Sequence, residues 1–102
     1  MENNPNELFV ICNPLACGGK AADRWQTFLE RAASFGLRVD ARVTNFSGHA
    51  TEIARTEARN GRHIIYVFGG DGTLNEVLNG VMENDRLISP EIELIYLTAG
   101  SS

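Results

Sequence analysis

The sequence predicts an α/β fold, a three-layer, Rossmann-like, doubly wound parallel sheet of four strands in the order 2-1-3-4. Two observations predict this fold. Short apolar runs alternate with segments of helical periodicity, and glycine-rich loops follow the first and third apolar runs. Because both loops would have to touch one ligand, the first and third strands should be neighbours, with a ligand crevice between them.

The elements follow from the patterning along the chain. The first run is continuously apolar, as in a strand buried on both faces, and the second alternates, which indicates a half-covered strand. Strands are expected at 8–12, 37–44, 63–68 and 92–97, with a surface connection at 83–91. Helices are expected between 19 and 35, from about 48 to 60, and from 74 to 82. The inward face of the last helix should carry Leu74, Val77, Leu78 and Val81.

The turn Gly-Gly-Asp-Gly-Thr at 69–73 joins the third strand to the last helix. Its glycines, Gly69, Gly70 and Gly72, permit positive φ angles that point consecutive backbone N–H groups into one concavity. The helix that follows adds unpaired N–H groups and the positive end of its dipole. The turn therefore predicts a phosphate site, to which Thr73 adds a hydroxyl group.

One carboxylate, Asp71, stands in the middle of this turn. A carboxylate beside phosphates repels them unless it holds Mg²⁺ or takes a proton from an attacking hydroxyl, and both roles belong to phosphoryl transfer. Asp71 is therefore the candidate catalytic base and metal ligand. An alternative stays open, because Thr73 and Glu76 also fit a capping box and such turns often carry glycine for geometry alone.

Composition restricts the partners. The chain has 102 residues, enough for one small domain, and a net charge of −4, which disfavours nucleic-acid binding and requires any phosphate affinity to be local. No apolar run approaches the roughly 20 residues that span a bilayer, and the start lacks the basic region of a signal peptide. We expect a soluble, cytoplasmic domain in which Cys12 and Cys17 are reduced thiols.

Three segments of the chain resemble motifs of the diacylglycerol kinase catalytic-domain family, and they follow one another along the chain in the order that the family has. This family includes sphingosine kinases, bacterial lipid kinases and, more distantly, the NAD kinases. The segment 69–76 is similar to its nucleotide-binding motif, and 13–20 is similar to its first loop, although Cys17 stands where glycine is usual. Thr44, with Gly-His-Ala at 48–50, resembles its second motif. The segment 95–102 aligns with the family's Ile-Pro-Leu-Gly-Thr-Gly-Asn-Asp, but has tyrosine for the proline and keeps little else.

The resemblance implies that residues 1–102 are the N-terminal nucleotide-binding α/β domain of a lipid kinase, without the family's C-terminal β-rich domain. It implies ATP and Mg²⁺ as cofactors and a lipid hydroxyl, of the diacylglycerol or sphingoid-base type, as acceptor. Besides Asp71, it implies nucleotide contacts at Asn13, Pro14, Gly18, Gly19, Thr44, Gly69, Gly70, Gly72, Thr73 and Glu76. We expect these 102 residues alone to be inactive, and any membrane contact to be peripheral, through the second domain.

Several alternatives stay open. An NAD kinase-like enzyme shares the Gly-Gly-Asp-Gly core, and a nucleotide-binding or interaction module without catalysis fits the altered last segment. His49 could orient a phosphate, but a residue at a helix start more often caps or fills space. Trp25 could stack on a base, but its helical spacing favours the core. The acceptor lipid and the oligomeric state are not predicted.

Overall fold

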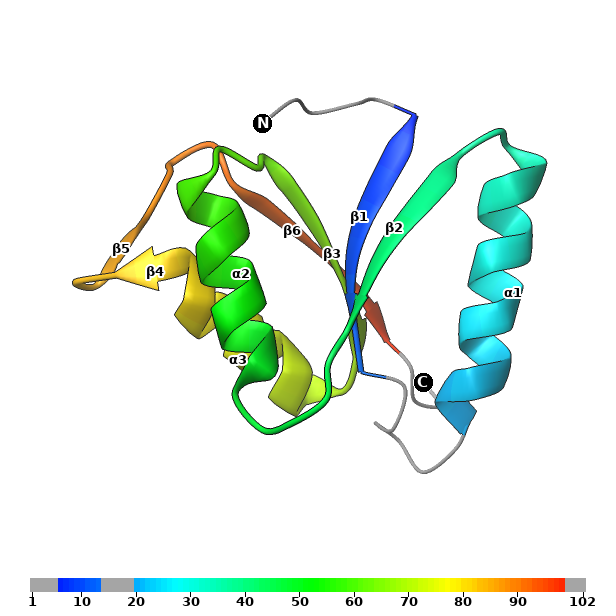
Figure 1. The fold of residues 1–102 in the computed structure, drawn as a ribbon, viewed down its shortest axis with the longest axis horizontal. Coiled ribbons are helices and arrows are strands. Elements are labelled where there is room, and N and C mark those ends of the chain that lie inside the picture. Colours follow the sequence, from blue (N-terminus) through cyan, green and yellow to red (C-terminus); the bar gives the residue numbers. More distant parts are fainter. Residues whose placement is uncertain (1–5, 14–19, 99–102) are drawn as a thin grey trace.

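The computed structural model describes residues 6–13 and 20–98. Figure 1 shows a central sheet with helix α1 (Lys20–Ser34) on one face and helices α2 (His49–Arg59) and α3 (Asp71–Val81) on the other. This is the three-layer α/β arrangement that the sequence predicts.

The sheet consists of four parallel strands in the order β2-β1-β3-β6. The strands are β1 (Glu7–Cys12), β2 (Arg38–Val43), β3 (Ile64–Gly69) and β6 (Glu93–Thr98). Because β6 is the fourth strand of the predicted sheet, the order 2-1-3-4 is confirmed. Cys12 pairs with Val43 of β2 and with Phe68 of β3, so these strands end at nearly the same level. Their carboxyl ends meet where the strand order reverses, the usual ligand position in such sheets.

The face covered by α2 and α3 is closely packed. Gly80 allows α3 to approach α2: a Cβ atom added to Gly80 would lie 2.5 Å from the Thr51 carbonyl oxygen and 2.7 Å from the Ala54 Cβ of α2. This contact holds the two helices in a fixed relation. The buried cluster on this face comprises Phe9, Ile11, Ala50, Ala54, Ala58, Ile65, Val67, Val77, Val81 and Ile92.

The face covered by α1 has a smaller core. Val10, Cys12 and Phe68 are buried there, and Trp25 and Phe28 of α1 pack against them. The Trp25 ring meets Phe68 edge to face with centroids 5.0 Å apart, and it stacks on Phe28 at 5.5 Å. The predicted core role of Trp25 is therefore confirmed, because its ring is engaged by aromatic neighbours inside this layer.

The connection at 83–91 differs from the simple surface loop that was predicted. It contains a hairpin of two short antiparallel strands, β4 (Met82–Glu83) and β5 (Arg86–Leu87). Asn84 and Asp85 form its turn with φ of 54° and 64°, and these residue types tolerate the left-handed conformation that two-residue hairpins need.

The last helix also differs from its prediction. It begins at Asp71 rather than Leu74, after Gly70 in extended conformation and without a side-chain cap. Thr73 therefore lies inside the first turn, and the capping-box interpretation is wrong. Leu78, predicted to face inward, is 41 % exposed, because the buried side of the helix runs through Val77 and Val81.

Among the described residues, no helix combines the length and the apolar character that crossing a bilayer requires.

Candidate functional site

Three strands end together at one edge of the sheet, and the residues that follow them build the candidate site. The Asn13 N–H donates to the Phe68 carbonyl oxygen at 2.9 Å, and the Thr44 N–H donates to the Cys12 carbonyl oxygen at 2.9 Å. These bonds continue the parallel pairing one residue beyond β1 and β2. The sheet itself therefore holds Asn13 and Thr44 in place.

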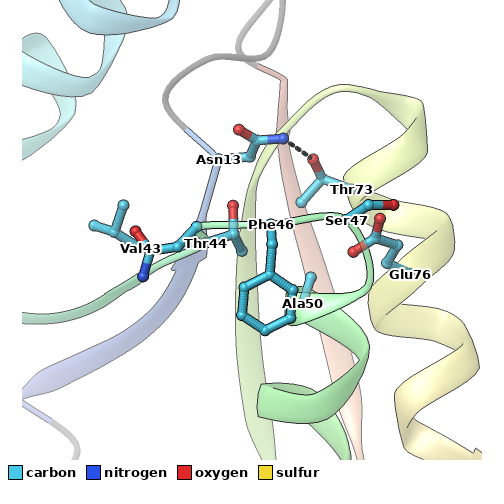
Figure 2. A pocket seen from close by; sticks show the side chains of 9 residues that line it. Asn13, Val43, Thr44, Phe46, Ser47, Ala50, Thr73 and Glu76 are labelled. Atoms are coloured by element: carbon cyan, nitrogen blue, oxygen red, sulfur yellow. Dashed lines mark hydrogen bonds between the residues drawn. The ribbon is translucent and has the colours of Figure 1, made fainter.

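The Asn13 side chain connects the end of β1 to α3. Its Nδ2 atom donates to Thr73 Oγ1 at 3.3 Å, as Figure 2 shows. Thr73 is 5 % exposed, and it lies so close to the end of β3 that a Cβ atom on Gly69 would come within 2.7 Å of its Oγ1. Glycine at position 69 is needed for this close approach.

These residues border a pocket of about 620 Å³ between the ends of the strands and the first turns of α2 and α3. Glu76 lies one helical turn beyond Thr73 and shares its side of α3. The pocket is lined by Asn13, Val43, Thr44, Asn45, Phe46, Ser47, Ala50, Thr73 and Glu76. Polar groups placed among apolar atoms are typical of small-molecule sites. The structure thus brings together four predicted contact residues, Asn13, Thr44, Thr73 and Glu76.

The glycine-rich turn has another conformation than the predicted one. Gly70 has φ of −96° and ψ of −174°. Among the described residues, the glycines with positive φ are Gly36, Gly48 and Gly61. The predicted concavity of positive-φ glycines is therefore wrong. What the turn offers instead is the N-terminus of α3, where Gly72 and Thr73 belong to the first turn and their N–H groups have no intrahelical acceptor.

Asp71 is the first residue of α3, and its side chain is exposed. Its Oδ1 accepts a hydrogen bond from the Tyr96 hydroxyl of β6 at 3.1 Å. Asp71 therefore turns toward β6, whereas Thr73, two residues later, lines the pocket. The N-terminal end of the helix dipole favours a negative charge at this position. An exposed carboxylate of this kind can accept a proton or contact a metal ion.

Tyr96 also lines a second hollow of about 630 Å³ on the α1 side of the sheet, which we call the α1 groove. The α1 groove is lined by Asp23, Arg24, Thr27, Phe28, Arg31, Phe68, Tyr96 and Leu97. Within the described residues, no three His, Cys, Asp or Glu side chains gather into a metal site. The hydrogen bond to Asp71 connects the N-terminus of α3 to the lining of this groove.

Three predicted contact residues, Pro14, Gly18 and Gly19, lie outside the described residues, as do Cys17 and the segment 99–102. Their roles stay predictions. Cys12 is described, and it is a free, buried thiol. Burial raises the pKa of the Cys12 thiol from its ordinary value near 9.0 to about 11, because the apolar surroundings disfavour the thiolate.

Sequence reasoning missed the contribution of the loop that joins β2 to α2. Phe46 and Ser47 line the pocket, and their signal was only their position directly after Thr44. His49 supports this loop: its Nδ1 accepts the Asn45 N–H at 3.0 Å, and its ring stacks on Phe46. His49 thus fills space at the start of α2, which agrees with the expectation that a residue at a helix start caps or fills space.

Comparison with known proteins identifies the family. The model of the diacylglycerol kinase catalytic domain matches residues 7–102. The chain is 35 % identical to a Streptococcus pneumoniae serotype 4 protein whose name places it among the lipid kinases, over 87 % of this chain and 30 % of that protein. It is 32 % identical to human mitochondrial acylglycerol kinase, over 91 % of this chain and 22 % of the relative.

A crystal structure of a diacylglycerol kinase from Bacillus anthracis str. Sterne superposes with a TM-score of 0.71 and 25 % identity, over 97 % of this chain and 35 % of that one. The names of these relatives place them in the class of lipid kinases. Within this class, the chain belongs to the diacylglycerol kinase catalytic domain family. It spans less than a third of the length of the curated relatives it matches.

Proposed function

We propose that this chain is the nucleotide-binding part of a lipid kinase that transfers the γ-phosphate of Mg·ATP to a lipid hydroxyl of the diacylglycerol or sphingoid-base type. The observation that carries the proposal is the pocket in which Asn13, Thr44 and Thr73 meet at the strand-order reversal. The three segments that resemble the family's motifs lie far apart in sequence, yet each contributes to this one edge. Membership in a lipid kinase family supports the same assignment.

The charges of the pocket indicate how the nucleotide would lie. Glu76 carries a carboxylate into the lining, and a carboxylate repels phosphates but accepts hydrogen bonds from ribose hydroxyl or base amino groups. The phosphates would therefore point away from Glu76, toward the N-terminus of α3. There, the N–H groups of Gly70, Gly72 and Thr73, together with the Thr73 hydroxyl, would donate to the phosphates.

Asp71 stands at the end of the helix where the phosphates would lie, and we assign it the role of base or metal contact. Mg²⁺ prefers oxygen ligands and is commonly bound through one or two carboxylates together with substrate phosphates, so the exposed Asp71 carboxylate fits this ion. When bound, Mg²⁺ would neutralise charge on the phosphates. Asp71 would accept the proton of the acceptor hydroxyl or help to hold the ion.

The acceptor site is assigned to a second domain of the longer protein, as in the predicted organisation of the family. In-line placement of the acceptor accounts for roughly 7–11 kcal/mol of the barrier in well-oriented reactions. The pocket at the strand ends is assigned to the nucleotide, and we place the acceptor outside it. We therefore propose that the 102-residue chain alone does not phosphorylate a lipid, and that membrane contact is peripheral and lies in that second domain.

A function without catalysis has one specific observation in its favour. Tyr96 stands where the family has proline, and its hydroxyl donates to the Asp71 carboxylate. This hydrogen bond occupies the carboxylate oxygen that would otherwise accept a proton or bind a metal ion. A nucleotide-binding module that has lost turnover would retain the pocket and tolerate this contact.

The test uses the longer protein that contains this chain, with labelled ATP, a panel of diacylglycerol and sphingoid lipids, and NAD in parallel. Labelled phospholipid supports the proposal. Labelled NADP would show an NAD kinase-like enzyme, and nucleotide binding without product would show a module. A matched pair, Thr73→Val and Thr27→Val, separates the pocket from the α1 groove: only Thr73→Val should weaken Mg·ATP binding, by roughly tenfold for a lost hydrogen bond to a charged group.

A further inference from the structure

Phe46 is a large aromatic residue in an unusual place. It is 56 % exposed and belongs to neither buried cluster, yet it lines the polar pocket. Burying a phenylalanine side chain is worth about 1.5–3 kcal/mol, so this residue leaves stabilising burial unused in the free protein. An aromatic ring left open inside a pocket is suited to contact a ligand.

The ring is also held in one orientation. Phe46 stacks on the His49 ring with centroids 4.3 Å apart and planes 10° from parallel. The His49 ring is itself fixed, because its Nδ1 accepts the Asn45 N–H at 3.0 Å. In addition, the His49 N–H donates to the Phe46 carbonyl oxygen at 3.1 Å, which closes a turn at the start of α2. The imidazole thus supports one side of the phenyl ring and leaves much of the rest exposed.

We propose that Phe46 is the stacking platform for the purine base of the nucleotide, and that His49 is the positioning residue that holds this platform. This inference rests on the proposed function and adds to it the residue that recognises the base. Figure 2 shows the Phe46 ring beside Ala50, in the same pocket as Thr44 and Glu76. Glu76 supplies an acceptor for polar groups on the base or ribose, while Phe46 supplies an apolar, flat surface.

Stacking of this kind recognises the shape of a base more than its hydrogen-bonding pattern, since every base has a π-face. Removing a stacking aromatic weakens binding by roughly tenfold to hundredfold. The loss should fall on ligands that contain the base. It should not affect a ligand that consists of phosphates alone, which would bind at the N-terminus of α3.

The test measures dissociation constants of adenosine, Mg·ATP and magnesium tripolyphosphate for the 102-residue chain by calorimetry. Phe46→Ala should raise the dissociation constants of adenosine and Mg·ATP by roughly tenfold to hundredfold. The dissociation constant of tripolyphosphate should change by no more than about twofold. Phe46→Tyr and Phe46→Trp should restore binding. His49→Ala should cause a smaller loss of affinity for adenosine. The matched control is Phe35→Ala, because Phe35 is 79 % exposed at the end of α1 and should leave all three constants unchanged.

The results can distinguish failure of the proposed function from failure of the stacking platform alone. If the wild-type chain binds none of the three ligands, both the proposed function and the platform are wrong. If it binds Mg·ATP and Phe46→Ala binds equally well, the platform alone is wrong. Equal weakening of tripolyphosphate and adenosine by Phe46→Ala would also overturn the platform. In that case the residue acts on the whole loop, and the melting temperature of the variant would confirm a folding effect.

Discussion

The two faces of the sheet are built differently. Under α2 and α3, the helices approach to the contact distance set by Gly80, and a large buried cluster lies beneath them. Under α1, the buried core is small, aromatic side chains complete it, and the α1 groove stays open beside β6. The pocket proposed to bind the nucleotide lies on the closely packed face, where Ala50, Thr73 and Glu76 come from the two interlocked helices.

The closer packing lies on the face that carries the candidate site. A site whose polar groups must be held within a fraction of an ångström gains from helices that cannot slide, and α2 and α3 provide this. The hydrogen bond between Tyr96 and Asp71 is a contact between the two faces, since Tyr96 lines the α1 groove and Asp71 begins α3. We call this contact the junction. Substitutions on each face and at this junction test the comparison.

The largest effect is expected at the junction, from Asp71→Asn in the longer protein. The substitution keeps the size and removes the basicity, so turnover should fall roughly 10²–10⁴-fold if the carboxylate is the base or holds the metal ion. The melting temperature should hardly change, because the side chain is exposed. Kinetics and thermal unfolding are measured on one preparation. Near-normal turnover, or a large loss of stability, would remove the catalytic assignment.

The α1 face can be probed through Cys12, in a Cys17→Ser background that removes the other thiol. Because the pKa of Cys12 is raised from about 9.0 to about 11, the folded protein at pH 8 contains about 100-fold less thiolate than an ordinary cysteine. Alkylation by iodoacetamide should slow by at least this factor. Where it does occur, it should report opening of the α1 layer.

The same thiol predicts a dependence of stability on pH. The unfolded chain loses its proton near pH 9, whereas the folded protein keeps it until about pH 11. The contribution is therefore fully present below pH 9 and is lost as the pH rises toward 11. Chemical unfolding of the Cys12→Ala variant, compared with the parent between pH 8 and 11, measures this difference. An identical pH dependence in both proteins would show that burial of the thiol is not coupled to folding.

The packed face is tested by Gly80→Val. The added side chain would collide with the Thr51 carbonyl and with Ala54, so we expect a loss of about 1–3 kcal/mol of unfolding free energy. The matched control is Gly72→Ala in the same helix, where a Cβ atom meets nothing within 4 Å. That change should be neutral, or stabilise by about 0.5–1 kcal/mol. Equal effects at both positions would mean that α2 and α3 are not in close contact.

The smallest effect is expected from Tyr96→Phe, which removes only the hydroxyl group that donates to Asp71. The hydrogen bond is exposed, so its loss should lower turnover by roughly tenfold or less, without changing the affinity for Mg·ATP. A steady-state measurement separates kcat from KM. A rise in turnover would instead show that the Tyr96 hydroxyl restrains the Asp71 carboxylate.

Much of the fold could be predicted from two features of the sequence. Strands and helices alternate, and the two glycine-rich loops require the first and third strands to be neighbours, which restricts the topology to one strand order. Asn13, Thr44, Thr73 and Glu76 were proposed as contacts through the family resemblance, and the structure brings them to one pocket because residues that follow adjacent parallel strands gather at one edge. Phe46 could not be found this way, because its exposure depends on how the loop from β2 closes against His49. The partner of Asp71 was equally hidden: Tyr96 lies on β6, and only the pairing of β6 with β3 brings it near. The conformation of Gly70 was wrongly predicted because a glycine-rich turn is compatible with several backbone paths.

Binding of the nucleotide on the packed face can be measured by titrating Mg·ATP into the ¹⁵N-labelled chain and following the amide chemical shifts by NMR. We expect saturable shifts at Asn13, Thr44, Ser47 and Thr73, while the shifts of Thr27 and Arg31 in the α1 groove should not change. Shifts confined to the α1 groove, or no shifts at millimolar nucleotide in a folded protein, would contradict binding on the packed face.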